Sequence, residues 1–317
     1  MLPERYSLEN LRRVAREPGL LRRELFTMAI AANRWWSDLT ARLRPGPEAV
    51  AVMDRDWDTL IILDACRYDL FAEHATVPGD GSLAAVRSLG SDSLEFMREN
   101  FEGRTLHDTV YVTSNPHVYQ LEDGIFHAVV NTLETHWDET DRTVPPDAMA
   151  DAAVTAHERY PNKRLIVHFM QPHFPFLGPT GRTFDHQGLD LHRQDGTGAP
   201  NPWYALVHGG PDRDTVLTAY RENLEVVLPH IDRLFEDIAG KTVVTADHGN
   251  LVGERGVPIP VRLYGHPRGL HRPELVTVPW YELVRGQRRS VVADPPQETE
   301  TASEQTVTDR LSALGYA

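Results

Sequence analysis

Five short apolar runs, each closed by polar residues or proline, are the feature of this chain that most constrains its fold. They lie at residues 59–63, 109–116, 164–172, 241–249 and 274–280. Continuous apolar runs of this length are typical of parallel strands that are covered on both faces. Between the third and fourth runs, residues 214–239 repeat apolar side chains at helical spacing up to Gly240, and Pro229 predicts a kink or a break.

Strands that alternate with helices predict an α/β domain. We expect it over residues 50–285, with a mainly parallel central sheet sandwiched by helices and ligands gathered beyond the carboxyl ends of the strands. Residues 177–213, rich in Gly, Pro, Asp and His, are expected to form a long loop near that edge. Residues 286–317 are expected to be a flexible linker and C-terminal tail.

Charge and cysteine content exclude several classes of protein. The net charge of −14 argues against nucleic-acid binding, because phosphate backbones are held by clustered basic residues. The single cysteine forms no internal disulfide. No signal core is seen, and no apolar run approaches the roughly 18 residues that span a bilayer. These features predict a cytoplasmic protein, with peripheral contact at the inner membrane face as an alternative.

Residues 1–45 differ in charge from the rest of the chain. They contain nine Arg and five acidic residues, a net charge of +4, which leaves −18 for the remainder. Apolar side chains recur here at helical spacing, at Leu21, Leu25, Met28, Ala32 and Trp35. An amphipathic helix is therefore expected. We favour a helix that packs its apolar face on the main domain; a basic helix on a membrane surface is the alternative.

Polar residues stand at the ends of the apolar runs. Asp64 closes the first run, Asp247 and His248 close the fourth, and His266 precedes the fifth. Two carboxylates with one or two imidazoles can hold a divalent cation, Zn²⁺ or Mn²⁺ first and Mg²⁺ or Ca²⁺ as alternatives. Taken alone, Asp64 indicates a helix N-cap and His248 a strand-end histidine, but the adjacent pair in "TADHG" favours a metal site.

The segments that contain these residues resemble the alkaline phosphatase superfamily, in particular its sulfatase-like and phosphodiesterase-like branches. Its first and late metal-binding segments are similar to "IILDACRYD" and "VVTADHGNLVGE". Three further stretches agree, namely "HFMQPHFPF", "GHPRGLHRPELVTVPW" and the terminal "LSALGYA". The resemblance covers roughly residues 55–285 and the tail, and it is greatest to sulfatase-like proteins of halophilic archaea. It implies an alkaline-phosphatase-like fold that binds divalent metal.

The resemblance also implies a nucleophile on the metal, at the N-terminus of a helix that follows the first Asp. Residues 86–100, "VRSLGSDSLEFMREN", place a glycine turn before a helical pattern. Ser93 is the expected nucleophile and metal ligand, with Ser91 as the alternative. A cation lowers the pKa of a hydroxyl, and a helix N-terminus favours the phosphate that it attacks. Either serine would instead simply cap the helix.

Further roles follow from the same resemblance. His173 is expected to bind the substrate oxyanion or to protonate the leaving group, with a packed aromatic residue as the alternative. His266 is expected to ligate the metal, a second metal or an anion, with His271 as its competitor; His271 is also a candidate substrate contact. Arg67 is a candidate contact for the substrate oxyanion, and an ion pair with Asp69 is its alternative. A second metal pair is sought among residues 185–192, although a one-metal site is as well supported.

The reaction implied is metal-assisted hydrolysis or transfer at a phosphate ester, by in-line attack of Ser93 on a phosphomonoester, a phosphodiester or a phospho-linked head group. The substrate is expected to be a small or lipid-linked anionic ester. A sulfatase is disfavoured because Cys-x-Pro-x-Arg is absent: Cys66 is followed by Arg-Tyr-Asp-Leu and is expected to be a small packed residue. The alternative is a degenerate member that binds metal or anionic glycan without turnover, which Asn250, where many relatives have Glu, keeps open.

Overall fold

The computed structural model describes residues 18–41, 46–76, 81–184, 201–206 and 210–297. The chain divides into two compact units: unit 1 is residues 1–45 with 253–263, and unit 2 is residues 46–252 with 264–317. The strands are β1 (Thr59–Asp64), β2 (Ser82–Arg87), β3 (Leu106–Thr113), β4 (Phe126–Asn131), β5 (Arg164–Pro172), β6 (Gly240–Ala246), β7 (Leu251–Arg255), β8 (Arg262–Gly265) and β9 (Thr277–Arg285). The α-helices are α2 (Pro18–Ala41), α3 (Tyr68–His74), α4 (Ser93–Phe101), α5 (Thr132–Thr135), α6 (Pro146–Arg159), α7 (Pro202–Ala205), α8 (Arg213–Asp237) and α9 (Pro273–Val276). Short 3-10 helices are η2 (Val52–Asp54), η3 (Pro116–Gln120) and η4 (Gly181–Thr183).

A seven-stranded sheet in the order β2-β9-β6-β1-β5-β3-β4 forms the centre of unit 2. β1 pairs in parallel with β5 and β6, and β3 pairs in parallel with β5 and β4. The prediction of a mainly parallel sheet is confirmed. β9 alone runs antiparallel to its neighbours β2 and β6. Its first residue, Thr277, pairs with Arg87, the last residue of β2, so the two strands run in opposite directions.

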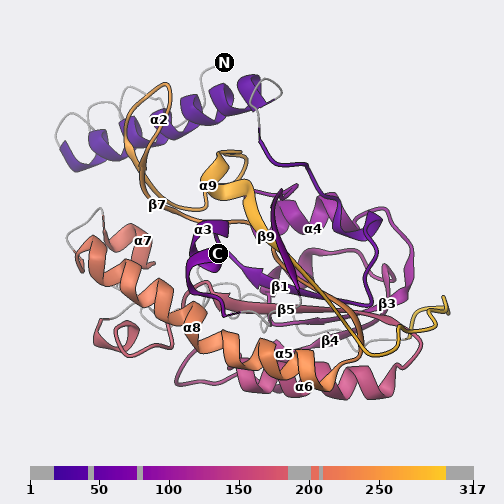
Figure 1. The fold of residues 1–317 in the computed structure, drawn as a ribbon. Coiled ribbons are helices and arrows are strands. Elements are labelled where there is room, and N and C mark those ends of the chain that lie inside the picture. The colour runs from indigo at the N-terminus through magenta and orange to yellow at the C-terminus, as the bar shows by residue number, and fades with distance from the viewer. Residues whose placement is uncertain (1–17, 42–45, 77–80, 185–200, 207–209, 298–317) are drawn as a thin grey trace. The chain divides into compact units, whose positions relative to one another are not determined.

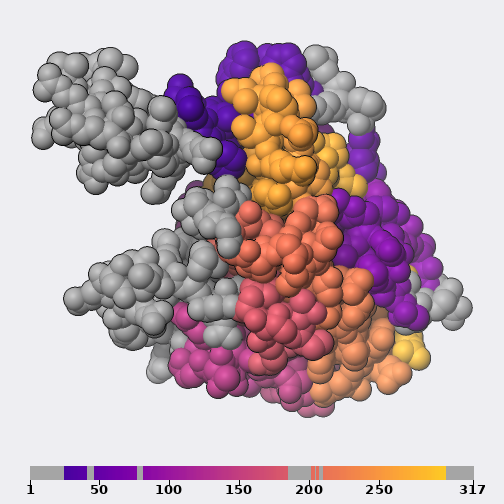
Figure 2. Space-filling view, turned by 90° about the vertical axis from the view of Figure 1, so that its left-hand side faces the viewer, coloured from indigo at the N-terminus to yellow at the C-terminus, as the bar shows by residue number. Residues whose placement is uncertain are grey.

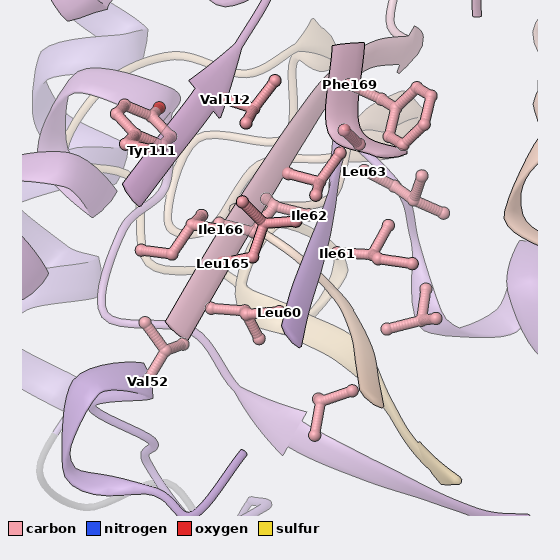
Figure 3. Packing of buried hydrophobic residues seen from close by; sticks show 14 of the residues in the cluster. Val52, Leu60, Ile61, Ile62, Leu63, Tyr111, Val112, Leu165, Ile166 and Phe169 are labelled. Carbon is pink, nitrogen blue, oxygen red and sulfur yellow. The ribbon is translucent and has the colours of Figure 1, made fainter. Parts of the chain in front are cut away.

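The core lies on both faces of the central strands. Leu60, Ile61, Ile62 and Leu63 are fully buried in β1, which explains why this run is apolar without alternation. Figure 3 shows these side chains interleaved with those of β5 and β3. Burial of one such side chain stabilises the fold by about 1.5–3 kcal/mol, so this run holds β1, and with it Asp64, rigidly in place.

Helices cover the two faces of the sheet in unit 2. Figure 1 shows α5, α6 and α8 on one face and α3, α4 and α9 on the other. The helix predicted over residues 214–239 is confirmed as α8, which begins after Asp212, whose carboxylate accepts a hydrogen bond from the amide of Thr215. The helix continues through Pro229, so a break does not occur, and the alternative of a kink stays a prediction.

The segment after β9 differs from a free linker. Residues 286–297 form no helix or strand but are tied to the rest of unit 2, where Arg288 pairs with Asp56 and Asp58, and Asp294 pairs with Lys163. The remainder of the expected linker and tail lies outside the described residues. In the described part of the chain, no helix is both long and apolar enough to cross a bilayer.

Candidate metal centre

Polar side chains from β1, β5 and β6 meet near the carboxyl edge of the sheet. Asp64 is the last residue of β1, Asp247 and His248 directly follow β6, and His168 lies within β5. Because β1 pairs in parallel with both β5 and β6, these positions come together beside its end. Ser93 joins them as the first residue of α4. All five residues are fully buried.

The donor atoms have the spacing of metal ligands. Nε2 of His248 lies 3.6 Å from Oδ1 of Asp64, 3.5 Å from Oδ2 of Asp247 and 3.3 Å from Oγ of Ser93. Oγ of Ser93 lies 3.2 Å from Oδ2 of Asp64. Four atoms that share a tetrahedral Zn²⁺ at about 2.0–2.1 Å lie about 3.3–3.4 Å apart. The observed separations are close to that value.

The hydrogen bond on the far side of His248 fixes what its ring offers the site. Nδ1 lies 2.7 Å from the carbonyl oxygen of Gly249, which can only accept, so Nδ1 carries the proton. Nε2 faces two buried carboxylates, and in the neutral ring it presents a lone pair to them. Groups buried this close are stabilised by a positive charge between them, either a proton on Nε2 or a metal ion. The donor set therefore fits a divalent cation.

Asp247 is held by the backbone through one oxygen only. Its Oδ1 accepts hydrogen bonds from the amides of Ala65 and His248, at 3.0 and 2.8 Å, and Ala65 adopts a left-handed φ of 59°. Its Oδ2 is buried and accepts no hydrogen bond. Burial opposes ionisation, but the positive charge of a protonated His248 and the facing His168 hold the pKa of the Asp247 carboxyl below its usual range. Oδ2 is thus an ionised oxygen whose charge a bound cation would balance.

His168 is a residue of the site that the sequence did not single out. Donor atoms of Asp64, His168 and Asp247 lie within 4.8 Å of one another, and this group could hold a metal ion. A chain of hydrogen bonds bears on its role: the Thr113 hydroxyl donates to Tyr111 Oη at 3.2 Å, and Tyr111 Oη lies 2.8 Å from His168 Nδ1. The Tyr111 proton is then directed at Nδ1, which leaves a proton on Nε2.

That proton faces Asp247. Nε2 of His168 is buried, makes no hydrogen bond and lies 3.6 Å from Oδ2 of Asp247. We assign His168 to the support of this carboxylate rather than to the ligand set. The only sequence signal was an imidazole inside an apolar strand, which fits a packed core histidine equally well.

The structure separates the two candidate serines. The N-cap of α4 is Asp92, whose carboxylate accepts from the amide of Glu95, so neither serine caps the helix. Oγ of Ser91 donates to Glu95 Oε2 at 2.6 Å and accepts from the amide of Gly269 at 2.7 Å. Ser93 instead donates to Asp64 inside the cluster.

Asn115 is a second residue that sequence reasoning missed. It follows β3 and donates from Nδ2 to Oδ2 of Asp64 at 2.7 Å. The amide therefore holds one carboxylate oxygen and leaves Oδ1 facing His248. Its position in "SNP" at the end of an apolar run was the available signal, since strand ends supply site residues in parallel sheets.

Two further histidines stand next to the cluster. Ring centroids of His248 and His266 are 4.7 Å apart, and those of His266 and His173 are 5.1 Å apart. Nδ1 of His173 donates to the Phe174 carbonyl at 2.6 Å, and Nδ1 of His266 lies 3.3 Å from Oδ1 of Asn250. Burial lowers the pKa of His173 to about 3 and that of His266 well below its usual value, so both rings are neutral at pH 7.

Two predicted substrate contacts have other partners. Arg67 donates to both carboxylate oxygens of Asp69, at 2.8 and 2.5 Å, and to the carbonyl of Asn250, so the ion-pair alternative describes it. His271 lies 2.9 Å from Glu95 Oε1. The residues sought for a second metal pair, Asp185, His186 and His192, lie outside the described residues.

A mainly parallel sheet between helices, with Asp and His at the ends of its central strands, is the alkaline-phosphatase-like arrangement that the motifs predict. No family model and no curated protein matches the chain. Among solved structures, it is similar to the integral membrane protein lipooligosaccharide phosphoethanolamine transferase A (EptA) from Neisseria meningitidis, with a TM-score of 0.44 and 13% identity over 80% of this chain and 54% of that one. The chain thus spans about half of that transferase.

Periplasmic domains of related transferases give similar values. The C-terminal periplasmic domain of EptC from Escherichia coli, in complex with Zn, has a TM-score of 0.42 and 12% identity, over 76% of this chain and 74% of that domain. The corresponding domain of EptC from Campylobacter jejuni has a TM-score of 0.42 and 11% identity, over 75% and 83%. These domains belong to the alkaline phosphatase superfamily, whose fold the chain was expected to share. Closeness to archaeal proteins stays a prediction.

The expected location requires correction. The cytoplasmic assignment, with its alternative at the inner membrane face, rested on the lack of a signal core and of a spanning run. The matched structures are instead an integral membrane protein and periplasmic domains. The cytoplasmic assignment is therefore withdrawn.

Proposed function

We propose that this chain is a metal-dependent phosphotransferase or phosphoric ester hydrolase in which Ser93 is the nucleophile. The observation that carries the proposal is the spacing of Ser93 Oγ, His248 Nε2 and the carboxylate oxygens of Asp64 and Asp247, at 3.2–3.6 Å. Asp64, Asp247 and His248 would hold the ion, with Ser93 beside it. A divalent ion bound there would lower the pKa of the hydroxyl and neutralise charge on the phosphate.

The residues around Ser93 suit attack on phosphorus. Its Oγ–H donates to Asp64 Oδ2, the acceptor placed to receive the proton as the hydroxyl ionises. Ser93 is the first residue of the nine-residue α4, so the helix N-terminus favours a phosphate in front of it. The Oγ–P bond would form as the bond to the leaving oxygen breaks. Water or an acceptor hydroxyl would then displace Ser93, which gives hydrolysis or transfer.

His173 and His266 are proposed to act on the substrate side of the cluster. Both rings carry their proton on Nδ1, toward Phe174 and Asn250, so each presents an Nε2 lone pair. A lone pair accepts a proton from an attacking hydroxyl or binds a second cation. The tautomer does not favour the donor role first expected of His173, because protonation would have to come first.

The substrate is proposed to be an anionic ester whose phosphate carries a head group, lipid-linked in the first instance. The matched EptA structure is a lipooligosaccharide phosphoethanolamine transferase, which has a substrate of this class. Zn²⁺ is the first ion to test and Mn²⁺ the second, because two carboxylates and an imidazole suit both.

The test combines metal analysis with a substrate panel. Purified protein loaded with Zn²⁺ or Mn²⁺ is assayed on chromogenic phosphomonoesters, phosphodiesters and sulfate esters, and on a fluorescent phosphoethanolamine lipid with and without an acceptor. Ser93→Ala should abolish turnover but fold, whereas Ser91→Ala and the exposed Ser290→Ala should retain it. Turnover that survives Ser93→Ala refutes the nucleophile. Bound metal with no turnover on the whole panel supports the degenerate binder instead.

A further inference from the structure

Exposed apolar side chains are concentrated in unit 1. Ten large hydrophobic residues are exposed among the described residues, and six of them lie in unit 1: Leu25, Met28, Trp35, Leu39, Val257 and Ile259. The described part of this unit is only helix α2 and residues 253–263, about a seventh of the residues described. Scattered exposed apolar residues are ordinary, but a cluster on one small unit marks a contact surface.

Helix α2 buries small and polar side chains and exposes large apolar ones, which is the opposite of the usual arrangement. Among its residues 25–40, whose side chains the structure describes, the buried positions are spaced by four residues and are Ala29, Asn33 and Ser37, all small or polar. Trp35 and Met28 are 64% and 55% exposed. A helix that packs on protein usually buries its large apolar side chains. Within unit 1, those of α2 instead form an apolar surface, and packing of this helix on the main domain stays a prediction.

The tip of the β7–β8 hairpin belongs to the same surface. Asn33 donates from Nδ2 to the carbonyl of Ile259 at 3.0 Å and accepts from the amide of Ile259 at 2.9 Å. This pair of bonds fixes the tip against α2, and both Figure 1 and Figure 2 show the two segments side by side. Val257 and Ile259, 49% and 39% exposed, therefore extend the apolar set of the helix.

Charge identifies the partner. Residues 1–45 carry +4, and residues 253–263 add Arg255 and Arg262 against Glu254, so unit 1 carries +5 and the rest of the chain −19. A second copy of unit 1 would place +5 against +5, which disfavours self-association through this surface. An anionic bilayer offers both an apolar phase and opposite charge, and Trp with Arg on an amphipathic helix is the composition of interfacial helices.

We propose that unit 1 docks on the surface of an anionic lipid bilayer, with the side chains of α2 and of the hairpin tip inserted among the lipids. In sequence, the hairpin lies between residues of the candidate centre, since β7 begins three residues after His248 and β8 ends just before His266. The proposal concerns α2 and the hairpin only, so it stands or falls separately from the reaction at Ser93.

The test is vesicle co-sedimentation of the full chain. Vesicles of phosphatidylcholine with phosphatidylglycerol should bind the protein at low salt, at least about tenfold more tightly than pure phosphatidylcholine vesicles do. High salt should weaken binding, because screening reduces the attraction between Arg and anionic head groups. A wild-type protein that does not bind the anionic vesicles refutes the proposal.

Paired variants test whether vesicle binding depends on this surface of unit 1 or on exposed apolar residues in general. Trp35→Ser with Leu39→Ser should weaken binding at least about tenfold. The matched pair Val284→Ser with Val292→Ser, exposed apolar residues of unit 2, should leave it unchanged. Thermal melting shows whether the helix variant is folded. If it is not, vesicle binding by Val257→Ser, at the hairpin tip, tests the same surface. The proposal is overturned if these variants of unit 1 bind vesicles as the wild type does. It is also overturned if the wild type is a dimer and the Trp35→Ser, Leu39→Ser variant is a monomer whose lipid binding is unchanged.

Discussion

Nε2 of His248 lies 3.5 Å from Oδ2 of Asp247, the residue directly before it, and both side chains are fully buried. The Nδ1 proton of His248 is committed to the carbonyl of Gly249. In the neutral ring, the Nε2 lone pair faces an ionised oxygen where water has no access. A positive charge between them, either a proton on Nε2 or a bound metal ion, resolves this conflict.

Asp247→Asn should abolish high-affinity metal binding. The amide carries no charge and can turn its NH₂ toward His248, which removes both the attraction for a cation and the need for one. Metal content after dialysis, measured by inductively coupled plasma mass spectrometry, should fall from near one ion per chain to a small fraction of that. Asp123→Asn, an exposed change elsewhere in unit 2, should keep the wild-type content. Equal content in both variants would remove Asp247 from the ligand set.

Tyr111→Phe should weaken metal binding without abolishing it. The change removes the hydroxyl that orients His168, and through His168 the support of Asp247. Loss of such an outer partner typically costs 10- to 100-fold in metal affinity. Competition with a fluorescent chelator measures it. Tyr160→Phe is the control, because Tyr160 is also buried and hydrogen bonded, but to Gln297. A similar loss in both variants would contradict the role of His168.

Glu95→Gln should destabilise the protein at neutral pH and much less in acid. Burial opposes ionisation of Glu95, but hydrogen bonds from His271 and Ser91 prevail and lower its pKa to about 2, from 4.5. A carboxyl whose pKa is depressed by folding contributes stability above its unfolded pKa. That contribution is lost as pH falls from about 4.5 to about 2.

Urea unfolding of Glu95→Gln measures this dependence. At pH 7 the variant should be about 1–2 kcal/mol less stable than wild type, after allowance for partial exposure of the side chain. The difference should shrink steadily below pH 4.5. Glu102→Gln, at the C-cap of the same helix and paired with the exposed Arg98, should change stability by less than about 0.5 kcal/mol throughout. A difference between wild type and Glu95→Gln that does not vary with pH would contradict the assigned cause.

The central strands and the residues at their ends could be predicted because one physical rule covers both. A strand buried on two faces must be apolar throughout, and parallel strands end at one edge. Asp64 and Asp247 therefore come together although 183 positions separate them in sequence. β2 and β4 escaped prediction because they are largely exposed or mixed in burial, and so lack a continuous apolar run.

Other relationships have no trace in a single sequence. The imidazole of His168 is set by Tyr111, a neighbour in the sheet rather than in the chain, so its role required the register of β3 on β5. The grouping of α2 with residues 253–263 depends on Asn33 and Ile259, which lie 226 positions apart. Neither partner of that contact has an unusual local pattern.

Cys66→Ala should leave metal content and any turnover nearly intact, whereas Asp64→Ala should remove both. Cys66 is fully buried directly after the end of β1, and its burial raises the pKa of the thiol well above its usual value. A neutral, enclosed thiol is a poor nucleophile and a poor metal ligand. The folded protein should therefore resist a thiol reagent at pH 8 and react fully once it is unfolded in guanidinium. Loss of the side chain should cost about 1 kcal/mol of stability through the small cavity that remains. A Cys66→Ala variant that folds but binds no metal, or rapid labelling of the native protein, would show that Cys66 takes part in the chemistry at the end of β1.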